Sequence, residues 1–275
     1  MTVVVIEICD DGLGLYPPSP PFTSLPTDVL AQWTNKTGAV IVEPVQGEGG
    51  IYHAEPAFMK ALKDLCVERG ALLIVDEVQC GLGRTGRLWA HEAYDVAPDI
   101  MTLAKPLAAG LPIGAVLMTN AVASAIAPGD HGTTFGGNPL AASVASHVLG
   151  RISAPAFLET SRARGAQLLE GCRKLKAKHS HAITEVRATL DGGLFIGVDL
   201  GPPFKLLQQA CVERGLLIIS AGENTVRLAP ALNIKEADIA KGLSILDEAL
   251  TVAYPKPWAD AQTSISSGPL WGAKI

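Results

Sequence analysis

The sequence lacks the features that mark several common protein classes. Its 22 basic and 27 acidic residues leave a net charge of −5, so no basic excess favours nucleic acid or an anionic membrane as a partner. The five cysteines are odd in number and form no CxxC pair, which fits free thiols in a reducing compartment better than a disulfide framework. The six histidines follow no zinc-binding spacing, so no metal site is expected, and His179 and His181 are interpreted as solvated surface residues.

Charge is also nearly missing from one long stretch. Between Pro106 and Gly150, histidines aside, Asp130 is the only acidic or basic residue. A membrane span at 106–129 is rejected, because prolines and glycines interrupt any helix there. We therefore expect this stretch to be buried in a core or against another subunit, which predicts an extensive oligomer interface.

The chain does contain a regular alternation of apolar runs and helical patterns. Unbroken apolar strands separated by helices indicate an α/β layer with a mainly parallel sheet, here over residues 38–154. The expected strands are 39–43, 71–76, 100–104 and 113–119, and the expected helices are 55–69, 88–94, 120–127 and 139–151.

The pattern changes near residue 155, and residues 155–253 predict a smaller α+β domain. Its expected helices are 155–178, 203–214 and 235–253, and its expected strands are 183–188, 193–199, 216–220 and 225–229. Residues 1–37 form an atypical proline-rich N-terminal segment, in which 9–28 are expected to be a loop or extended arm, and 254–275 are expected to be a loose tail. Neither a secretory signal nor a transit peptide is recognised at the start, so a cytoplasmic location is expected, or an organelle matrix if the N-terminus is incomplete.

A glycine motif at 81–86 (GLGRTG) fits the dinucleotide-binding pattern G-x-G-x-x-G. That pattern requires a strand that runs directly into the first glycine and a helix that begins at the loop. Here Asp76, Glu77 and Gln79 lie between the strand and Gly81. A plain turn is therefore the favoured interpretation, and a nicotinamide oxidoreductase is the weaker alternative.

Asp76 and Lys105 each follow a predicted strand, so both should lie at the carboxyl edge of the parallel sheet, where ligands bind. Taken singly, the aspartate could equally cap a helix, and a lysine there is usually a surface residue. In its uncharged neighbourhood Lys105 is expected to be partly desolvated, which would lower the pKa of the amine and favour its attack on an aldehyde. Together the two residues suit pyridoxal phosphate, which carries an aldehyde and a ring nitrogen that requires a carboxylate.

Six segments then form a specific, ordered set. They are 42–50 (VEPVQGEGG), 74–86 (IVDEVQCGLGRTG), 98–105 (PDIMTLAK), 110–115 (GLPIGA), 131–139 (HGTTFGGNP) and 226–233 (VRLAPALN). Over about residues 38–250 the chain resembles the class III pyridoxal-phosphate-dependent aminotransferases, in particular the acetylornithine and ornithine branch. The resemblance implies a fold-type I transferase-like large domain, incomplete here, a smaller C-terminal domain, and a homodimer.

The resemblance also implies the residues that hold the cofactor. Lys105 would bond its aldehyde and later move a proton between substrate and cofactor. Asp76 would pair with the ring nitrogen, Val78 would pack under the ring, and Gln79 would reach the ring hydroxyl. Thr134 would cross the dimer interface to the partner's cofactor phosphate.

Two further residues would handle the substrate. By resemblance, Arg227 holds a substrate carboxylate, and Glu48 pairs with this arginine in one half-reaction and releases it in the other. A guanidinium suits bidentate carboxylate recognition, although either residue taken singly could equally be a surface residue.

The chain departs from the family before Gly38. The family's phosphate-binding loop, a stacking aromatic residue and an arginine for the donor's α-carboxylate are not recognised there, so the chain is interpreted as N-terminally truncated, with weak cofactor binding. The expected reaction converts N-acetylornithine and 2-oxoglutarate into N-acetylglutamate semialdehyde and glutamate, within arginine biosynthesis. Alternatives are another ω-amino donor such as ornithine, or an inactive homologue that dimerises with a full-length relative.

Overall fold

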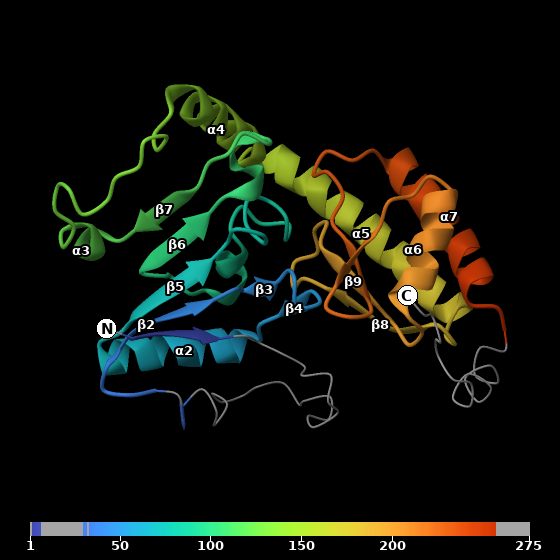
Figure 1. Cartoon of the computed structure of the whole chain (residues 1–275), viewed down its shortest axis with the longest axis horizontal. Coiled ribbons are helices and arrows are strands. Elements are labelled where there is room, and N and C mark those ends of the chain that lie inside the picture. Colours follow the sequence, from blue (N-terminus) through green and yellow to red (C-terminus); the bar gives the residue numbers. More distant parts are fainter. Residues whose placement is uncertain (1, 7–29, 32, 257–275) are drawn as a thin grey trace, which may run out of the picture.

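The computed structural model describes residues 2–6, 30–31 and 33–256. The described elements form two sheets side by side, joined by a long helix, as Figure 1 shows. The predicted proline-rich arm and nearly all of the predicted C-terminal tail lie outside the described residues.

The first sheet has five strands in the order β1-β2-β5-β6-β7. The first three pairings are parallel and the β6–β7 pairing is antiparallel. The strands are β1 (Thr2–Ile6), β2 (Thr37–Val42), β5 (Leu72–Asp76), β6 (Ile100–Leu103) and β7 (Ala115–Met118). The mainly parallel α/β fold predicted from the apolar runs is therefore present.

Helix α2 (Pro56–Arg69) covers one side of this sheet and connects β2 with β5. It buries Phe58 and Leu62 against the strand residues Leu73 and Val75. The helix ends at Gly70, which adopts a left-handed conformation that a residue with a side chain rarely takes. The chain thus turns directly into β5, whose carboxyl end carries Asp76.

Shorter elements complete this half. A two-stranded hairpin, β3 (Val45–Gln46) and β4 (Tyr52–His53), follows β2. Two 3₁₀ helices flank β6, namely η1 (Ala90–Tyr94) and η2 (Lys105–Ala108). Beyond β7 come α3 (Asn120–Ala123) and α4 (Pro139–Ile152).

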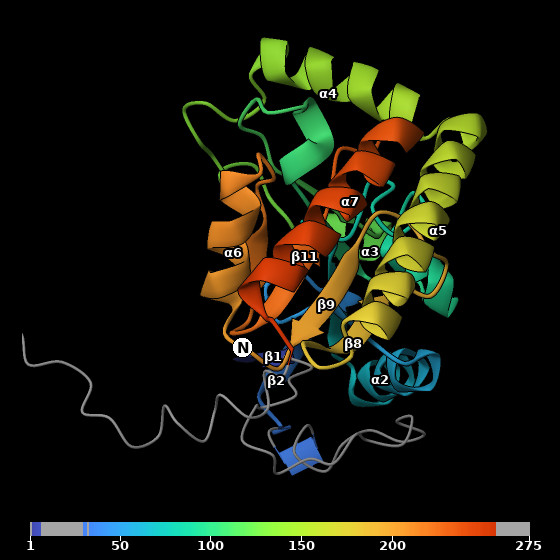
Figure 2. The same cartoon turned by 90° about the vertical axis from the view of Figure 1, so that its right-hand side faces the viewer.

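The second sheet has four antiparallel strands in the order β10-β11-β9-β8. The strands are β8 (Ile183–Ala188), β9 (Ile196–Leu200), β10 (Ile219–Ala221) and β11 (Thr225–Leu228). The helices are α5 (Pro155–Lys178), α6 (Phe204–Glu213) and α7 (Glu236–Ala253). Figure 2 shows these helices in front of the strands, and the core between them is almost entirely aliphatic.

Several expectations fail in detail. Strands β1, β3 and β4 were not predicted, and α3 is shorter than the expected helix. His179 is not a solvated surface residue, because it is buried and its Nε2 lies 2.6 Å from Asp247 Oδ1. Tyr254 does not belong to a loose tail, because its side chain is buried and its hydroxyl donates to the Pro203 carbonyl oxygen at 2.9 Å.

The four cysteines in the described part are free and buried, in line with the expected free thiols: Cys66, Cys80, Cys172 and Cys211. Among the described residues, no helix is long and apolar enough to cross a membrane.

Candidate active site

Asp76 and Lys105 lie at the same edge of the first sheet, as predicted. Strands β5 and β6 are parallel neighbours, with Asp76 opposite Thr102, and Lys105 follows the end of β6 directly. The Lys105 backbone has a φ of 34°, a left-handed conformation that is uncommon for a residue with a side chain. Such backbone strain, which costs on the order of 1 kcal/mol, is often found at functional sites.

The expected desolvation of Lys105 is wrong, because the structure exposes its side chain. The apolar neighbours that the sequence places around it do not cover the amine. Leu107 and Ala108 turn into the core, whereas Ala109 and Gly110 are exposed. The residues that flank Lys105 in sequence therefore do not form an apolar pocket around it.

The two acids at the end of β5, Asp76 and Glu77, bind different partners. Asp76 Oδ1 accepts a hydrogen bond from the Val78 amide at 2.9 Å, within a turn and not at the start of a helix. Glu77 is buried and binds the amides of Ala90 and His91 at 2.7 and 2.8 Å, at the beginning of η1. The helix-capping alternative for Asp76 is therefore wrong, and its neighbour Glu77 takes that role.

A third charged residue, Glu43, was not assigned a role from the sequence. It follows β2, so three neighbouring strands (β2, β5 and β6) carry Glu43, Asp76 and Lys105 at or just past their carboxyl ends. Burial raises the pKa of the Glu43 carboxyl, opposed by a hydrogen bond from the Gly47 amide at 3.2 Å. The argument that selected Asp76, an acid at the carboxyl end of a parallel strand, applies equally to Glu43.

Glu48, Gln79 and Arg227 form one hydrogen-bonded cluster. Arg227 Nη1 donates to Glu48 Oε1 at 2.6 Å and to Gln79 Oε1 at 2.9 Å, and Gln79 Nε2 donates to Glu48 Oε1 at 3.0 Å. The hydrogen bonds from Arg227 and then Gln79 hold the pKa of the Glu48 carboxyl below its usual value. The Glu48 side chain is 71% exposed and that of Arg227 is 12% exposed, so the carboxylate can swing into solvent without crossing packed residues.

Gly47 makes this cluster possible. A Cβ atom at Gly47 would lie 1.8 Å from Gln79 Oε1, so any side chain there would displace the glutamine. The Gly47 carbonyl oxygen also accepts from Arg227 Nη1 at 3.1 Å. Gly47, one of three glycines in the 42–50 segment, therefore permits a close approach between two loops that follow different strands.

The two remaining predicted cofactor residues, Val78 and Thr134, differ in their position relative to the site. Val78 is half-buried beside Asp76. Thr134 is exposed in the loop between α3 and α4, and no hydrogen bond joins its side chain to another described residue. The described chain brings Asp76, Val78, Gln79, Glu48 and Arg227 into one region but does not add Thr134 to it through any contact.

The glycine motif at 81–86 is a turn, as favoured from the sequence. Its Arg84 is half-buried and donates from Nη1 to the carbonyl oxygens of Leu194 and Pro230, at 2.9 and 2.6 Å. Burial lowers the pKa of this guanidinium to about 10. The loop thus fastens the first half of the chain to the second, and no helix begins there to bind a dinucleotide phosphate.

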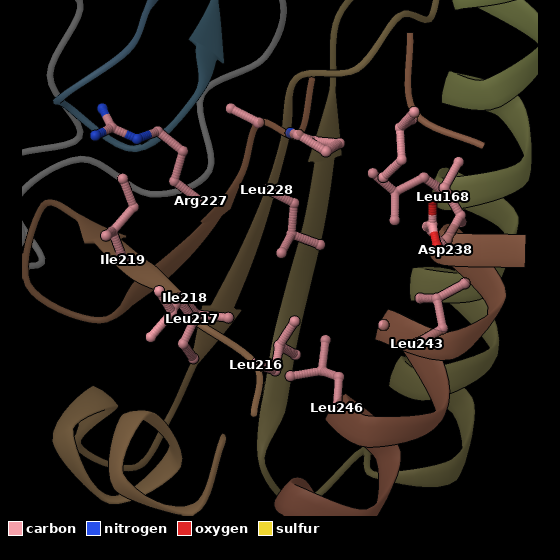
Figure 3. Close-up of a pocket in the computed structure, with 15 residues that line it drawn as sticks. Leu168, Leu216, Leu217, Ile218, Ile219, Arg227, Leu228, Asp238, Leu243 and Leu246 are labelled. Carbon is pink, nitrogen blue, oxygen red and sulfur yellow. The ribbon is translucent and has the colours of Figure 1, made fainter. Parts of the chain in front are cut away.

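A cavity of about 320 Å³ lies in the second half, between β10–β11 and helices α5 and α7, and apolar side chains line it. Arg227 stands at its edge, but Figure 3 shows the guanidinium pointing away from the leucines. This cavity therefore lies on the opposite side of Arg227 from Glu48, and it is not the space in which Asp76 and Lys105 would act.

Comparison with known proteins agrees with this arrangement. The aminotransferase class-III family model matches residues 22–250. A probable mitochondrial acetylornithine aminotransferase of Dictyostelium discoideum is 51% identical over 215 residues, which are 77% of this chain and 47% of that protein. The mitochondrial acetylornithine aminotransferase of Yarrowia lipolytica is 49% identical over 79% of this chain and 52% of its own length. The chain thus spans about half the length of the curated relatives it matches.

Solved structures give the same result. The N-acetylornithine aminotransferase of Stenotrophomonas maltophilia superposes with a TM-score of 0.73 at 35% identity, over 82% of this chain and 59% of that chain. An ornithine aminotransferase of Toxoplasma gondii has a TM-score of 0.75 at 33% identity, over 82% and 53% of the two chains, and contains PLP (pyridoxal phosphate) at partial occupancy in its active site. On the family match and these identities, the chain belongs to the class III aminotransferases, a family of pyridoxal-phosphate-dependent enzymes.

Proposed function

We propose that this chain performs pyridoxal-phosphate-dependent transamination, with N-acetylornithine as amino donor and 2-oxoglutarate as acceptor. The products are N-acetylglutamate semialdehyde and glutamate. The observation that carries the proposal is the placement of an aspartate and a lysine at the carboxyl ends of adjacent parallel strands, next to an arginine that is paired with an exposed glutamate.

The described residues fit the cofactor in its reactive parts. The exposed Lys105 amine is free to bond an aldehyde, and Asp76 lies one strand away to pair with a ring nitrogen. When bound, pyridoxal phosphate supplies an aldehyde that takes up the amino group and a ring that withdraws electrons from it. Val78 would pack against the ring, Gln79 would bind its hydroxyl, and Thr134 would bind the phosphate held by a second subunit.

Lys105 also has a part in proton transfer. With pyridoxal phosphate bound, the Lys105 Nζ would be the group that holds and moves the proton between the substrate carbon and the cofactor. The φ of 34° at Lys105 describes the course of the main chain just after β6, from which this side chain extends.

Arg227 and Glu48 would sort the two substrates. A 2-oxo acid with a second carboxylate displaces Glu48 and takes both hydrogen bonds of the guanidinium. A donor without that carboxylate leaves the 2.6 Å ion pair closed. One arginine can therefore serve both half-reactions, because its carboxylate partner is exposed and replaceable.

The cofactor site is tested by covalent labelling. The purified chain is mixed with pyridoxal phosphate, reduced with borohydride and digested, with Lys105→Ala as the matched control. The proposal expects a visible absorption band before reduction and a pyridoxyl mass on the peptide that contains Lys105. A label spread over surface lysines, or an unchanged band in the control, would contradict it.

The donor is tested by a panel of amines under the same conditions. N-acetylornithine is expected to give glutamate fastest, ahead of ornithine, succinylornithine and 4-aminobutyrate. A faster reaction with ornithine would assign the chain to the ornithine branch of the family. The panel is needed because Arg227 and Glu48 recognise the carboxylate that all these reactions share in their acceptor.

A second candidate function is that of a non-catalytic dimer partner. Strand β7 ends the sheet order, with Val116 55% and Leu117 44% exposed, and Phe135 in the following loop is 84% exposed. Figure 1 shows this edge together with α3 at one end of the molecule. The long uncharged stretch expected in a core or interface is thus left open by the described chain, as a subunit contact requires.

Sedimentation of the purified chain tests whether it dimerises through β7, and co-purification then separates the two functions. The second candidate expects dimers that Leu117→Lys dissociates, whereas Leu217→Lys, at an equally apolar and more exposed position on the second half, leaves them intact. Co-purification with a full-length homologue in the absence of bound cofactor would favour this candidate over catalysis. A monomeric wild-type chain would exclude a stable homodimer through β7.

The compartment belongs to the proposal as well. The eukaryotic relatives described above are named as mitochondrial proteins. The two locations expected from the sequence, the cytoplasm and the organelle matrix, are separated by fractionation of cells that express the chain at native level.

A further inference from the structure

The turn that carries Glu48 is held from the other half of the molecule. This turn, residues 47–50, connects β3 with β4, and three of its four carbonyl oxygens accept hydrogen bonds from residues of the second sheet and its loops. The bonds run from Arg227 Nη1 to Gly47 O at 3.1 Å, from the Gly222 amide to Glu48 O at 2.7 Å, and from Arg187 Nε to Gly50 O at 2.9 Å.

Arg187, on β8, is the least exposed of these donors. Its side chain is 7% exposed and forms a bidentate ion pair with Asp199, with Nη2 2.6 Å from Asp199 Oδ1. Its guanidinium also donates to Glu185 at 2.6 Å and to Thr225 at 3.1 Å. A planar guanidinium fixed at this many points has a single orientation, so its Nε–H points at Gly50 O without freedom to turn.

The turn packs directly on this guanidinium. The Tyr52 ring lies under it, with Arg187 Cζ 4.0 Å from the ring centroid. Gly50 has a φ of 122°, and a Cβ atom there would come within 2.8 Å of Tyr52 and 3.3 Å of Arg187. The hairpin is therefore seated on Arg187 through a backbone carbonyl and an aromatic face at once.

We propose that Arg187 is a positioning residue that sets the Glu48–Arg227 pair by fixing the turn between β3 and β4. In this role Arg187 acts on the hairpin through Gly50 and Tyr52, while its bonds to Asp199 and Thr225 fix its own orientation. The inference rests on the proposed function, because it assigns the turn a purpose in exchanging Glu48 for a substrate carboxylate at Arg227. Arg187 lies on β8 of the second sheet, and Asp199 balances its charge.

Hydrogen exchange of the purified chain tests the positioning without any ligand. In Arg187→Lys the ammonium still balances Asp199 but cannot span to Gly50, so the amides of the 47–51 segment and of Gly222 should exchange at least about tenfold faster. The matched control is Arg164→Lys, because Arg164 pairs with Glu236 on the surface of the same half and does not touch the turn. Tyr52→Leu, which removes the ring and keeps Arg187, should accelerate the same amides.

The link to the Glu48–Arg227 pair is tested with glutarate, an unreactive dicarboxylate, by calorimetry. Loosening the turn weakens the competing Glu48, so Arg187→Lys should raise glutarate affinity by about three- to tenfold. In a Glu48→Gln background the same substitution should change the affinity by less than about twofold, since the competitor is already gone.

The outcomes separate the two proposals. Unchanged exchange in both Arg187→Lys and Tyr52→Leu would overturn the role of Arg187, and so would an equal affinity change in both backgrounds. Failure of glutarate to bind wild type and Glu48→Gln alike would overturn the proposed carboxylate site. In that case the exchange data still decide whether Arg187 holds the turn.

Discussion

Glu48 and Arg227 are 179 residues apart in the chain, and their side chains meet at 2.6 Å. One comes from a turn beside the parallel sheet and the other from a strand of the antiparallel sheet. Their contact, bridged by Gln79, joins the two halves of the protein at the candidate site. Four experiments follow from this arrangement and from its surroundings.

Arg227→Lys should weaken the binding of a dicarboxylate while leaving the fold intact. A lysine keeps the positive charge but loses the planar pair of donors, and each charge-assisted hydrogen bond contributes about 1.5–3 kcal/mol. Glutarate affinity should therefore fall by about ten- to a hundredfold, measured by calorimetry. Equal affinity in wild type and Arg227→Lys would remove Arg227 from the substrate site.

The Glu48 pair should respond to acid. Because the pKa of Glu48 is lowered in the folded state, the pair contributes stability above the ordinary value of 4.5, and this contribution is lost as the pH falls through the folded-state pKa. The difference in urea midpoint between wild type and Glu48→Gln should shrink from about pH 6 to about pH 3.5, and the change should be small because the side chain is exposed. A difference that grows on acidification would contradict the assignment.

Glu43 should show the opposite sign. Burial raises its pKa in the folded state, so the folded protein binds a proton more tightly than the unfolded chain, and stability is lost as the pH rises from 4.5 through the raised value. Glu43→Gln mimics the neutral form and can still accept from the Gly47 amide. Its unfolding midpoint should exceed that of wild type at neutral pH and match it in acid, by urea titration at both.

Two glycine substitutions should separate structural from functional glycines. A Cβ atom at Gly193 would lie 2.4 Å from the backbone of Thr85, and Gly193 has a φ of 94°, so Gly193→Ala should cost about 3 kcal/mol or more of unfolding free energy. At Gly47 the clash is with the end of the Gln79 side chain, which can move away. Gly47→Ala should lower the unfolding free energy by less than about 1 kcal/mol. It should instead change the affinity for glutarate, because the displaced Gln79 no longer holds Glu48.

Much of the fold was predictable because its signals are local. The apolar runs at β2, β5 and β6 and the periodic helices α2, α4, α5 and α7 appear within a few residues of their predicted bounds. Strands β3 and β4 have two residues each, which is too few to show any periodicity. Strand β1 is an apolar run in the sequence, but no predicted turn or helix next to it marks it as a strand. The antiparallel direction of β7 depends on its pairing with β6, which a run of apolar residues does not encode.

The site divides in the same way. The sequence alone determined that Asp76 and Lys105 share one edge of the sheet, because parallel strands place their carboxyl ends together. It also determined the family, through ordered segments that hold the glycines and charged residues of the site. The sequence did not determine which of these side chains are exposed. Lys105 is exposed and His179 is buried, because burial depends on which distant residues pack over a side chain.

Only the tertiary structure decided which partners the charged side chains bind. Arg187 donates a hydrogen bond to the Gly50 carbonyl oxygen. Arg84 donates to the carbonyl oxygens of Leu194 and Pro230. Glu48 accepts from both Gln79 and Arg227. The bonds of Arg187, Arg84 and Arg227 join residues more than a hundred positions apart, and Gln79 lies 31 positions from Glu48, so sequence spacing carries no record of them. The local sequence supplied the reactive groups, and their partners followed from the packing of the two halves.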